Sequence, residues 1–473
     1  MAAVDPNHDY GAALVPICHL SRHRALDTTP RAAHDPGAET EPLSRLRLVG
    51  GTVVTLDEER TLLDPGEVGL DGGRIDYVGP VRAPETAGDV LDVSGQAVLP
   101  GLVNAHTHVA MTLMRSYADD MPLQPWLEDR IWPLERHLTP DDVYWGTLLG
   151  AVEMLRGGVT TFCDMYWHAP RAVDAGLEAG MRVCPSGVLI GLLPDADAML
   201  ARASDFVDAC LARAHPRLHI RYGPHAPYTV PDAYLAKVVA AAAERGVPIH
   251  IHLAETAKEV ADSQAQHGES PVAHMARVGL FDVPCTAAHC VHLSPADIAT
   301  LAERRVGVAA CLTSNLKLGS GVPLVPELRA AGAIVGLGTD GTASNNNLDV
   351  FEEILLTALL YKGLRHDPTL ITAYEALEMA TWGGAQAVGL DRLGRLKPGW
   401  RADVICVDLS GPHLCPGHNV VSDVVYAARS HDVTTVVVEG ELAVRDRQLT
   451  DIDEAEVVTR ARQVALDLVA RAG

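Results

Sequence analysis

Short apolar segments alternate with Ala- and Leu-rich helical segments from residue 101 to about residue 390. The helical segment 232–245 ends at Gly246, a residue typical of helix C-termini. Repeated strand–helix units over about 250 residues or more predict an α/β fold, a (β/α)8 barrel of the TIM type. A doubly wound sheet is the alternative, but no Gly-rich phosphate loop follows the first strand. Strands are predicted, among others, at residues 159–163, 218–222, 249–253 and 334–337.

Both ends of the chain predict short β-strands instead. A DGG sequence at residues 71–73 predicts a tight hairpin between two of them. Later strands are predicted at residues 402–407, 424–426, 433–439 and 442–444, before a last helix at about 454–470. We expect the two ends to form one small β-sandwich beside the barrel. The predicted organisation is a flexible N-terminal extension (1–45), the N-terminal section of the sandwich (46–100), the metal-dependent barrel (101–393), and the C-terminal section of the sandwich with the last helix (394–473).

Charge and composition narrow the kind of partner. The 38 Lys and Arg against 61 Asp and Glu give a net charge of −23, which argues against binding a nucleic-acid backbone. No apolar run reaches the ~20 residues that span a bilayer. The nine cysteines show no CxxC spacing, which favours a reduced setting over a disulfide framework. We expect a cytoplasmic homo-oligomer that acts on a small molecule, away from nucleic acid and membranes.

Candidate metal ligands stand where predicted strands end. His106 and His108 follow the segment 100–103, and residues two apart in a strand share a face. Both imidazoles can therefore point into the barrel mouth and bind one ion, and neutral imidazole suits zinc or iron. The pair by itself is weak evidence, which gains weight only from partners at other strand ends.

Two histidines and two acids supply those partners. Active sites lie at the carboxyl ends of barrel strands, so His252 is the predicted ligand and His250 a deeper, hydrogen-bonded core residue. Glu255 follows at the strand-to-helix turn and can reach the same space as an acid. His289 ends the next predicted strand, and Asp340 ends a later one between glycines.

Three histidines and one carboxylate on a metal leave room for a water molecule. Such a metal lowers the pKa of that water towards ~7. Asp340 can take the water's proton, Glu255 can give one to the substrate, and His289 can hold the hydroxide or stabilise developing charge. The pattern predicts a metal-dependent hydrolase.

Several motifs resemble the amidohydrolase superfamily, over residues 46 to 473. They are PGLVNAHTH at 100–108, HLAET at 252–256, HC at 289–290 and GTDG at 338–341, and the tail GRLKPGWRAD at 394–403 is also typical. The resemblance implies a (β/α)8 barrel with a β-sandwich formed from both chain ends. It also implies one Zn²⁺, with Fe²⁺ or Mn²⁺ as alternatives, bound by His106, His108, His252 and Asp340.

Three further stretches resemble the methylthioadenosine/S-adenosylhomocysteine deaminase group. Residues 126–135 resemble the segment whose final glutamate holds the ribose hydroxyls, residues 223–229 the segment whose histidine contacts the substrate, and residues 314–318 the loop after the seventh strand. The resemblance implies substrate contacts from Trp126, Glu135, His225 and Glu255, and catalytic roles for Glu255, His289 and Asp340.

Two departures from family patterns bear on the metal count and the substrate. The strand before His225 has no lysine, where two-metal members often carry a carbamylated one, so a single metal is expected. Members that accept S-adenosylhomocysteine often carry an arginine after the third barrel strand, but residues 184–188 contain none, and Arg202 is a substitute that the sequence does not place. A simpler 5′ group, as in adenosine, methylthioadenosine or 5′-deoxyadenosine, is at least as well favoured.

The resulting hypothesis is hydrolytic deamination at C6 of adenosine-type nucleosides, which yields the inosine analogue and ammonia. A metal-activated water attacks C6, Glu255 protonates N1, and Asp340 carries a proton to the leaving amine. The alternative is an aminohydrolase of the same architecture that acts on guanine, an oxidised purine, a pterin or a triazine. Glu135 argues against it, because a ribose-binding carboxylate has no role with a free base. A metal-free scaffold is less favoured still, because all the predicted metal ligands and catalytic residues are present: His106, His108, His252, Glu255, His289 and Asp340.

Overall fold

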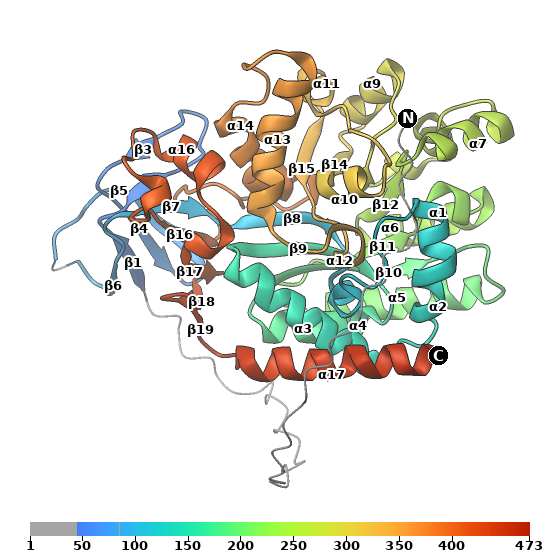
Figure 1. The fold of residues 1–473 in the computed structure, drawn as a ribbon, viewed down its shortest axis with the longest axis horizontal. Coiled ribbons are helices and arrows are strands. Elements are labelled where there is room, and N and C mark those ends of the chain that lie inside the picture. The colour runs from blue at the N-terminus through green and yellow to red at the C-terminus, as the bar shows by residue number, and fades with distance from the viewer. Residues whose placement is uncertain (1–44, 85) are drawn as a thin grey trace, which may run out of the picture. The chain divides into compact units, whose positions relative to one another are not determined.

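Eight parallel strands form the barrel that the alternating pattern predicts (Figure 1). The structure, a computed structural model, describes residues 45–84 and 86–473, so the predicted extension at 1–45 lies outside it except for its last residue. The strands follow one another in sequence order. The last and first strands also meet, because the backbone N–H of Asp340, just after the last strand, donates to the carbonyl of His106 in the first strand over 3.1 Å. They are β8 (Leu102–Thr107), β9 (Val159–Tyr166), β10 (Arg182–Leu189), β11 (Arg221–Pro224), β12 (Ile249–Leu253), β13 (Cys285–His289), β14 (Gly307–Ala310) and β15 (Ile334–Leu337).

Helices connect these strands, and some have a capping side chain at the start or a glycine at the end. The side chain of Thr139 caps α3 (Pro140–Arg156) in a reciprocal arrangement with Asp142, and Gly246, at φ +64°, ends α6 (Asp232–Arg245) as predicted. Other helices that follow barrel strands include α4 (Ala169–Glu178), α5 (Ala196–Arg213), α7 (Ala257–His267), α8 (Pro271–Arg277), α9 (Pro295–Glu303), α10 (Leu312–Lys317), α11 (Val325–Ala330), α12 (Thr342–Asn345), α13 (Val350–Arg365), α14 (Ala373–Glu378) and α15 (Gly384–Ala387).

The strands at the two chain ends form two sheets, seen as blue and red arrows in Figure 1. One sheet has the order β5 (Arg74–Pro80), β4 (Gly66–Asp71), β1 (Leu46–Val49) and β6 (Asp89–Asp92). The other has the order β19 (Gln448–Leu449), β18 (Glu441–Arg445), β17 (Val433–Val438), β16 (Val404–Asp408), β7 (Gln96–Pro100), β2 (Thr52–Val54) and β3 (Leu62–Leu63). Strand β7 pairs antiparallel with β16, and the apolar core between the sheets draws on both ends of the chain. The predicted sandwich is confirmed.

Two predicted strands are wrong in position or type. The strand predicted at 218–222 is β11, which starts only at Arg221: Leu218 forms an isolated bridge with Val183 of β10, and continuous pairing with β10 begins at Arg221. The strand predicted at 424–426 is helical: α16 (Val420–Ser422), capped by Asn419, continues into the helical turn Asp423–Ala427. Short apolar runs do not distinguish a buried strand from a buried helical turn.

Buried ion pairs join the barrel to the seven-stranded sheet. The Arg182 side chain, fully buried at the start of β10, donates to Asp403 over 2.7 and 3.2 Å and also contacts Glu439. On the other flank, α17 (Glu454–Ala472) packs on α3, where Arg156 pairs with Glu454 at 2.9 Å. Within the described residues, no helix is both long and apolar enough to cross a membrane.

Candidate active site

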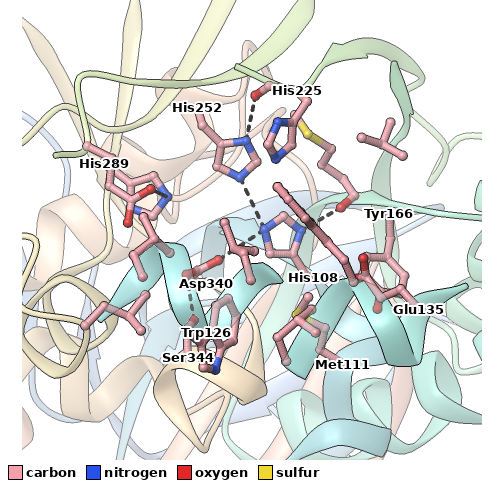
Figure 2. A pocket seen from close by; sticks show the side chains of 18 of the residues that line it. His108, Met111, Trp126, Glu135, Tyr166, His225, His252, His289, Asp340 and Ser344 are labelled. Carbon is pink, nitrogen blue, oxygen red and sulfur yellow. Dashed lines mark hydrogen bonds and ion pairs between the residues drawn. The ribbon is translucent and has the colours of Figure 1, made fainter. Parts of the chain in front are cut away.

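The four predicted metal ligands meet at the carboxyl end of the barrel, and Figure 2 shows three of them, His108, His252 and Asp340. The Nε2 atoms of His108 and His252 lie 3.2 Å apart. Asp340 Oδ1 lies 3.3 Å from Nε2 of His106 and 3.2 Å from Nε2 of His108. Ligands at ~2.0–2.2 Å from one Zn²⁺ in tetrahedral geometry stand ~3.3–3.6 Å apart, so the observed spacings of 3.2 and 3.3 Å are close to those around a single ion.

Hydrogen bonds donated by Nδ1–H fix the ring orientation of two of these histidines. Nδ1–H of His108 donates to the Met165 carbonyl over 2.6 Å, and Nδ1–H of His252 donates to the His225 carbonyl over 2.7 Å. Each bond keeps the ring proton away from Nε2, whose lone pair then faces the cluster. Nδ1 of His106 instead faces Nε2 of His250 at 2.8 Å, and His250 is a buried, hydrogen-bonded core residue as predicted.

Two buried atoms of the cluster have no hydrogen-bond partner: Nε2 of His106 and Oδ1 of Asp340. Buried polar atoms are nearly always paired, so these two indicate a missing partner. The other carboxylate oxygen of Asp340 accepts hydrogen bonds from the hydroxyls of Ser314 and Ser344, each over 2.7 Å. Oδ2 of Asp340 is therefore saturated, whereas Oδ1 is left for a cation. Together with the Nε2 atoms of the histidines, Oδ1 forms a set of ligands that suits a divalent metal.

The charge state of the imidazoles also suits a cation. Burial lowers the pKa of His106 to about 4 and that of His252 well below its ordinary value, so both rings are neutral. Burial opposes a charge on His108 as well, but the hydrogen bond and charge of Asp340 outweigh it and raise its pKa to about 9. The cluster thus attracts one positive charge, a proton or a metal ion.

Glu255 and His289 stand beside the cluster. Burial, helped by the charge of Asp340, raises the pKa of Glu255 to about 7, and Ser320 donates to its Oε1 over 3.1 Å. Nδ2–H of Asn315 donates to Nδ1 of His289 over 2.9 Å, which leaves the ring proton on Nε2, 3.8 Å from Glu255. Glu255 can therefore hold a transferable proton near neutral pH, with a second donor next to it.

A concave pocket opens over these groups and gives a small molecule access to them. His106 is fully buried beneath the pocket, and the other eight predicted site residues line it. Glu135, on α2 (Trp132–Glu135), accepts a hydrogen bond from Trp167 Nε1 over 3.2 Å, and burial raises its pKa. Trp126, on α1 (Leu123–Trp126), packs here with its Nε1–H donated to the Ala118 carbonyl over 3.1 Å.

Several residues of the pocket were missed from the sequence, among them Tyr166, Trp167 and Ser344. Tyr166 ends β9 and Trp167 follows it, but the predicted strand stopped at residue 163, so its carboxyl end was placed too early in the chain. Ser344 lies on the short helix α12, four residues after Asp340, and its hydroxyl donates to the Asp340 carboxylate.

The position expected for an arginine is also corrected. Residues 184–188 lie inside β10, and the loop after this strand comprises residues 190–195, again without arginine. Arg202 lies exposed on α5 and pairs with Asp195 at 3.0 Å. Among the described residues that line the pocket, none is Lys or Arg.

The fold and the cluster are those of a known family of hydrolases. The amidohydrolase family matches residues 97–443. Because this match covers well over half of the 473 residues, the chain belongs to the amidohydrolase family.

Relatives within the family carry a more specific name. The chain is 46% identical over 432 residues to a 5-methylthioadenosine/S-adenosylhomocysteine deaminase of Pelotomaculum thermopropionicum, which covers 91% of this chain and 100% of the relative. It is 48% identical over 408 residues to a deaminase of the same name from Desulforudis audaxviator, covering 85% and 95%. The predicted resemblance to this deaminase group is confirmed.

Solved structures agree with the fold. An adenosine deaminase from Xanthomonas campestris with bound zinc is 39% identical, with a TM-score of 0.85 over 90% of this chain and 98% of that one. Atrazine chlorohydrolase from Arthrobacter aurescens, complexed with zinc, is 24% identical with a TM-score of 0.82 over 89% and 100%, a likeness of fold alone. Together with the His–His–His–Asp cluster, the zinc-bound adenosine deaminase supports a divalent metal ion at this site.

Proposed function

We propose that this protein hydrolytically deaminates adenosine-type nucleosides at C6, giving the inosine analogue and ammonia. One observation carries the proposal: Glu135 and Glu255 line the same pocket as the cluster that fits a divalent cation. An acid beside the cluster suits N1 of a purine, and a second acid farther along the pocket suits the vicinal hydroxyls of a ribose. The deaminase names of the relatives and of the adenosine deaminase structure support the same reaction.

One divalent ion, Zn²⁺ with Fe²⁺ or Mn²⁺ as alternatives, would be held by His106, His108, His252 and Asp340. A bound ion of this kind supplies hydroxide at neutral pH by lowering the pKa of water towards ~7. The described strand before His225 has no lysine that could bridge a second ion, which supports a single ion.

The side chains then move protons around the reacting carbon. Asp340 receives the proton that water releases as its oxygen bonds to C6, and Glu255 gives its proton to N1. His289, with its Nε2 proton directed into the site, stabilises charge on that oxygen. Asp340 passes its proton to the amine, the C6–N bond breaks and ammonia leaves. Glu255 recovers a proton as the new hydroxyl becomes the C6 carbonyl, so that the cycle closes.

Other residues of the pocket orient the nucleoside. Glu135, held by Trp167, accepts hydrogen bonds from the ribose hydroxyls. His225, whose Nδ1 lies 3.0 Å from the Thr229 hydroxyl, and Trp126 contact the purine nucleoside from the pocket wall. A free base such as guanine has no ribose hydroxyls to donate to the Glu135 carboxylate, which would then keep only its protein partners such as Trp167, and this disfavours the alternative substrates.

The charge of the pocket bears on the 5′ group. The described residues that line it include no Lys or Arg to pair with an amino-acid carboxylate, whereas Val188 and Ile190, at the end of β10, are apolar. We therefore propose that adenosine, 5′-deoxyadenosine and methylthioadenosine are better substrates than S-adenosylhomocysteine. Because an unpaired buried carboxylate is costly, we expect kcat/KM for S-adenosylhomocysteine to be about tenfold or more below that for methylthioadenosine.

The test is a substrate panel with zinc-loaded protein, read as the change from adenosine-like to inosine-like absorbance. The panel holds adenosine, methylthioadenosine, 5′-deoxyadenosine, S-adenosylhomocysteine, adenine and guanine. The Asp340→Ala variant, purified identically, controls for adenosine deaminase from the expression host. No turnover of any nucleoside with Zn²⁺, Fe²⁺ or Mn²⁺ would contradict the proposal, as would a preference for guanine. The homo-oligomer, the cytoplasmic location and the domain boundaries stay predictions. Sedimentation velocity would measure the oligomeric state.

A further inference from the structure

His250 is a buried histidine that the proposed reaction does not use. It lies on β12 two residues before His252 and is fully buried, below the pocket rather than in its lining. Its Nε2 lies 2.8 Å from Nδ1 of His106, and its Nδ1 lies 3.5 Å from the Cys163 sulfur. The three side chains form a line across the barrel interior, from β8 through β12 to β9.

The partner of His106 differs in kind from those of the other two histidine ligands. His108 and His252 each donate Nδ1–H to a backbone carbonyl, an atom that only accepts, so the lone pair at Nε2 is assured. His106 faces an imidazole nitrogen, which either donates or accepts depending on its own proton. For His106 the acceptor position is occupied by a side-chain nitrogen of His250 instead of a backbone carbonyl.

Only one proton arrangement in this line leaves His106 able to bind a cation. If Nε2 of His250 carried the proton, Nδ1 of His106 would accept it and the His106 proton would sit on Nε2, directed at Asp340. If the His250 proton is on Nδ1, directed at the Cys163 sulfur, then Nε2 of His250 accepts from His106. The Nε2 lone pair of His106 is then free, and this is the atom found without a hydrogen-bond partner.

We propose that His250 is a positioning residue for the metal centre: it accepts Nδ1–H of His106 and thereby keeps His106 Nε2 available as a ligand. Cys163 completes the arrangement by receiving Nδ1–H of His250. The inference rests on the metal centre proposed above. It extends that centre by two residues which touch neither the ion nor the substrate.

Two amides of similar size test the proposal, because Gln and Asn match different nitrogens of histidine. In His250→Gln the side-chain oxygen reaches the place of Nε2 and still accepts from His106. In His250→Asn the shorter amide reaches only the place of Nδ1 and leaves His106 without an acceptor. We expect zinc affinity within about threefold of wild type for the Gln variant and a loss of roughly 10–100-fold for the Asn variant, the usual range for such partners.

The measurement is zinc competition against a chromogenic chelator, with the Co²⁺ d–d absorption spectrum as a second readout of ligand geometry. Equal zinc affinity in wild type, Gln and Asn variants would overturn the inference alone. A wild-type protein that binds no zinc would overturn the proposed function as well. Should the Asn variant fail to fold, Cys163→Val is compared with Cys163→Ser, which keeps an acceptor. Weaker zinc binding in the Val variant only is expected, and equal binding in both would contradict the proposal.

Discussion

Replacing Glu255 by Gln removes the proton that we assign to N1 of the purine. The change preserves the shape of the side chain, and Ser320 can still donate to the amide oxygen, so the fold is expected to persist. A positioned proton donor contributes about 10²–10⁴-fold to the rate, which corresponds to roughly 2.7–5.5 kcal/mol of activation free energy. We therefore expect kcat/KM for adenosine to fall by at least about 100-fold.

The pH dependence gives this prediction a second, independent signature. The pKa of Glu255 is raised to about 7, and the protonated form is the active one, so kcat/KM should fall as the pH rises through 7. With that pKa, about 90% of the carboxyl is protonated at pH 6 and about 10% at pH 8, so the rate should drop about tenfold between them. The Gln variant cannot lose this proton and should show no such decline.

Glu259 provides the matched control. Its pKa is also raised to about 7 by burial, but it accepts the backbone N–H groups of Ala254 and Glu255 and does not line the pocket. Glu259→Gln should therefore keep the decline above pH 7. Absorbance assays from pH 5.5 to 9 measure both variants. Turnover of Glu255→Gln within tenfold of wild type, or an unchanged pH profile in it, would refute the role of Glu255 as proton donor.

Three further predictions concern other regions of the molecule. Glu135→Gln should lower kcat/KM for adenosine about 100-fold, because two hydrogen bonds to a charged group are worth ~1.5 kcal/mol each or more. Steady-state kinetics should show little change in kcat/KM for 2′,3′-dideoxyadenosine, and an equal loss for both substrates would contradict ribose binding by Glu135. Chelator dialysis should abolish deamination and lower the unfolding temperature, because the ion binds only the folded chain; added Zn²⁺ should restore both in calorimetry and activity assays. Arg182→Met should lower the free energy of unfolding by about 3–5 kcal/mol, because it leaves the buried Asp403 carboxylate without its ion-pair partner. Denaturant unfolding measures this free energy, and an unchanged value would show that the ion pair contributes nothing to stability.

The sequence alone was sufficient to predict the fold and most of the site, because both depend on local periodicity. Strand–helix alternation predicts the barrel, and a parallel barrel brings the carboxyl ends of all its strands to one mouth. His106, His252, His289 and Asp340 were therefore predicted to meet although they are far apart in the chain, and the structure brings them together. Local pattern was less informative for residues 424–426, where an apolar run is helical.

Only the tertiary structure decided which side chains serve the site from outside these positions. It placed Arg202 on an exposed helix face, away from the pocket, and brought Trp167 to Glu135. It also set Nε2 of His250 against Nδ1 of His106, a contact between residues 144 positions apart. Such contacts form across the barrel interior, and their geometry depends on strand register and packing, which no periodicity within one strand or helix encodes.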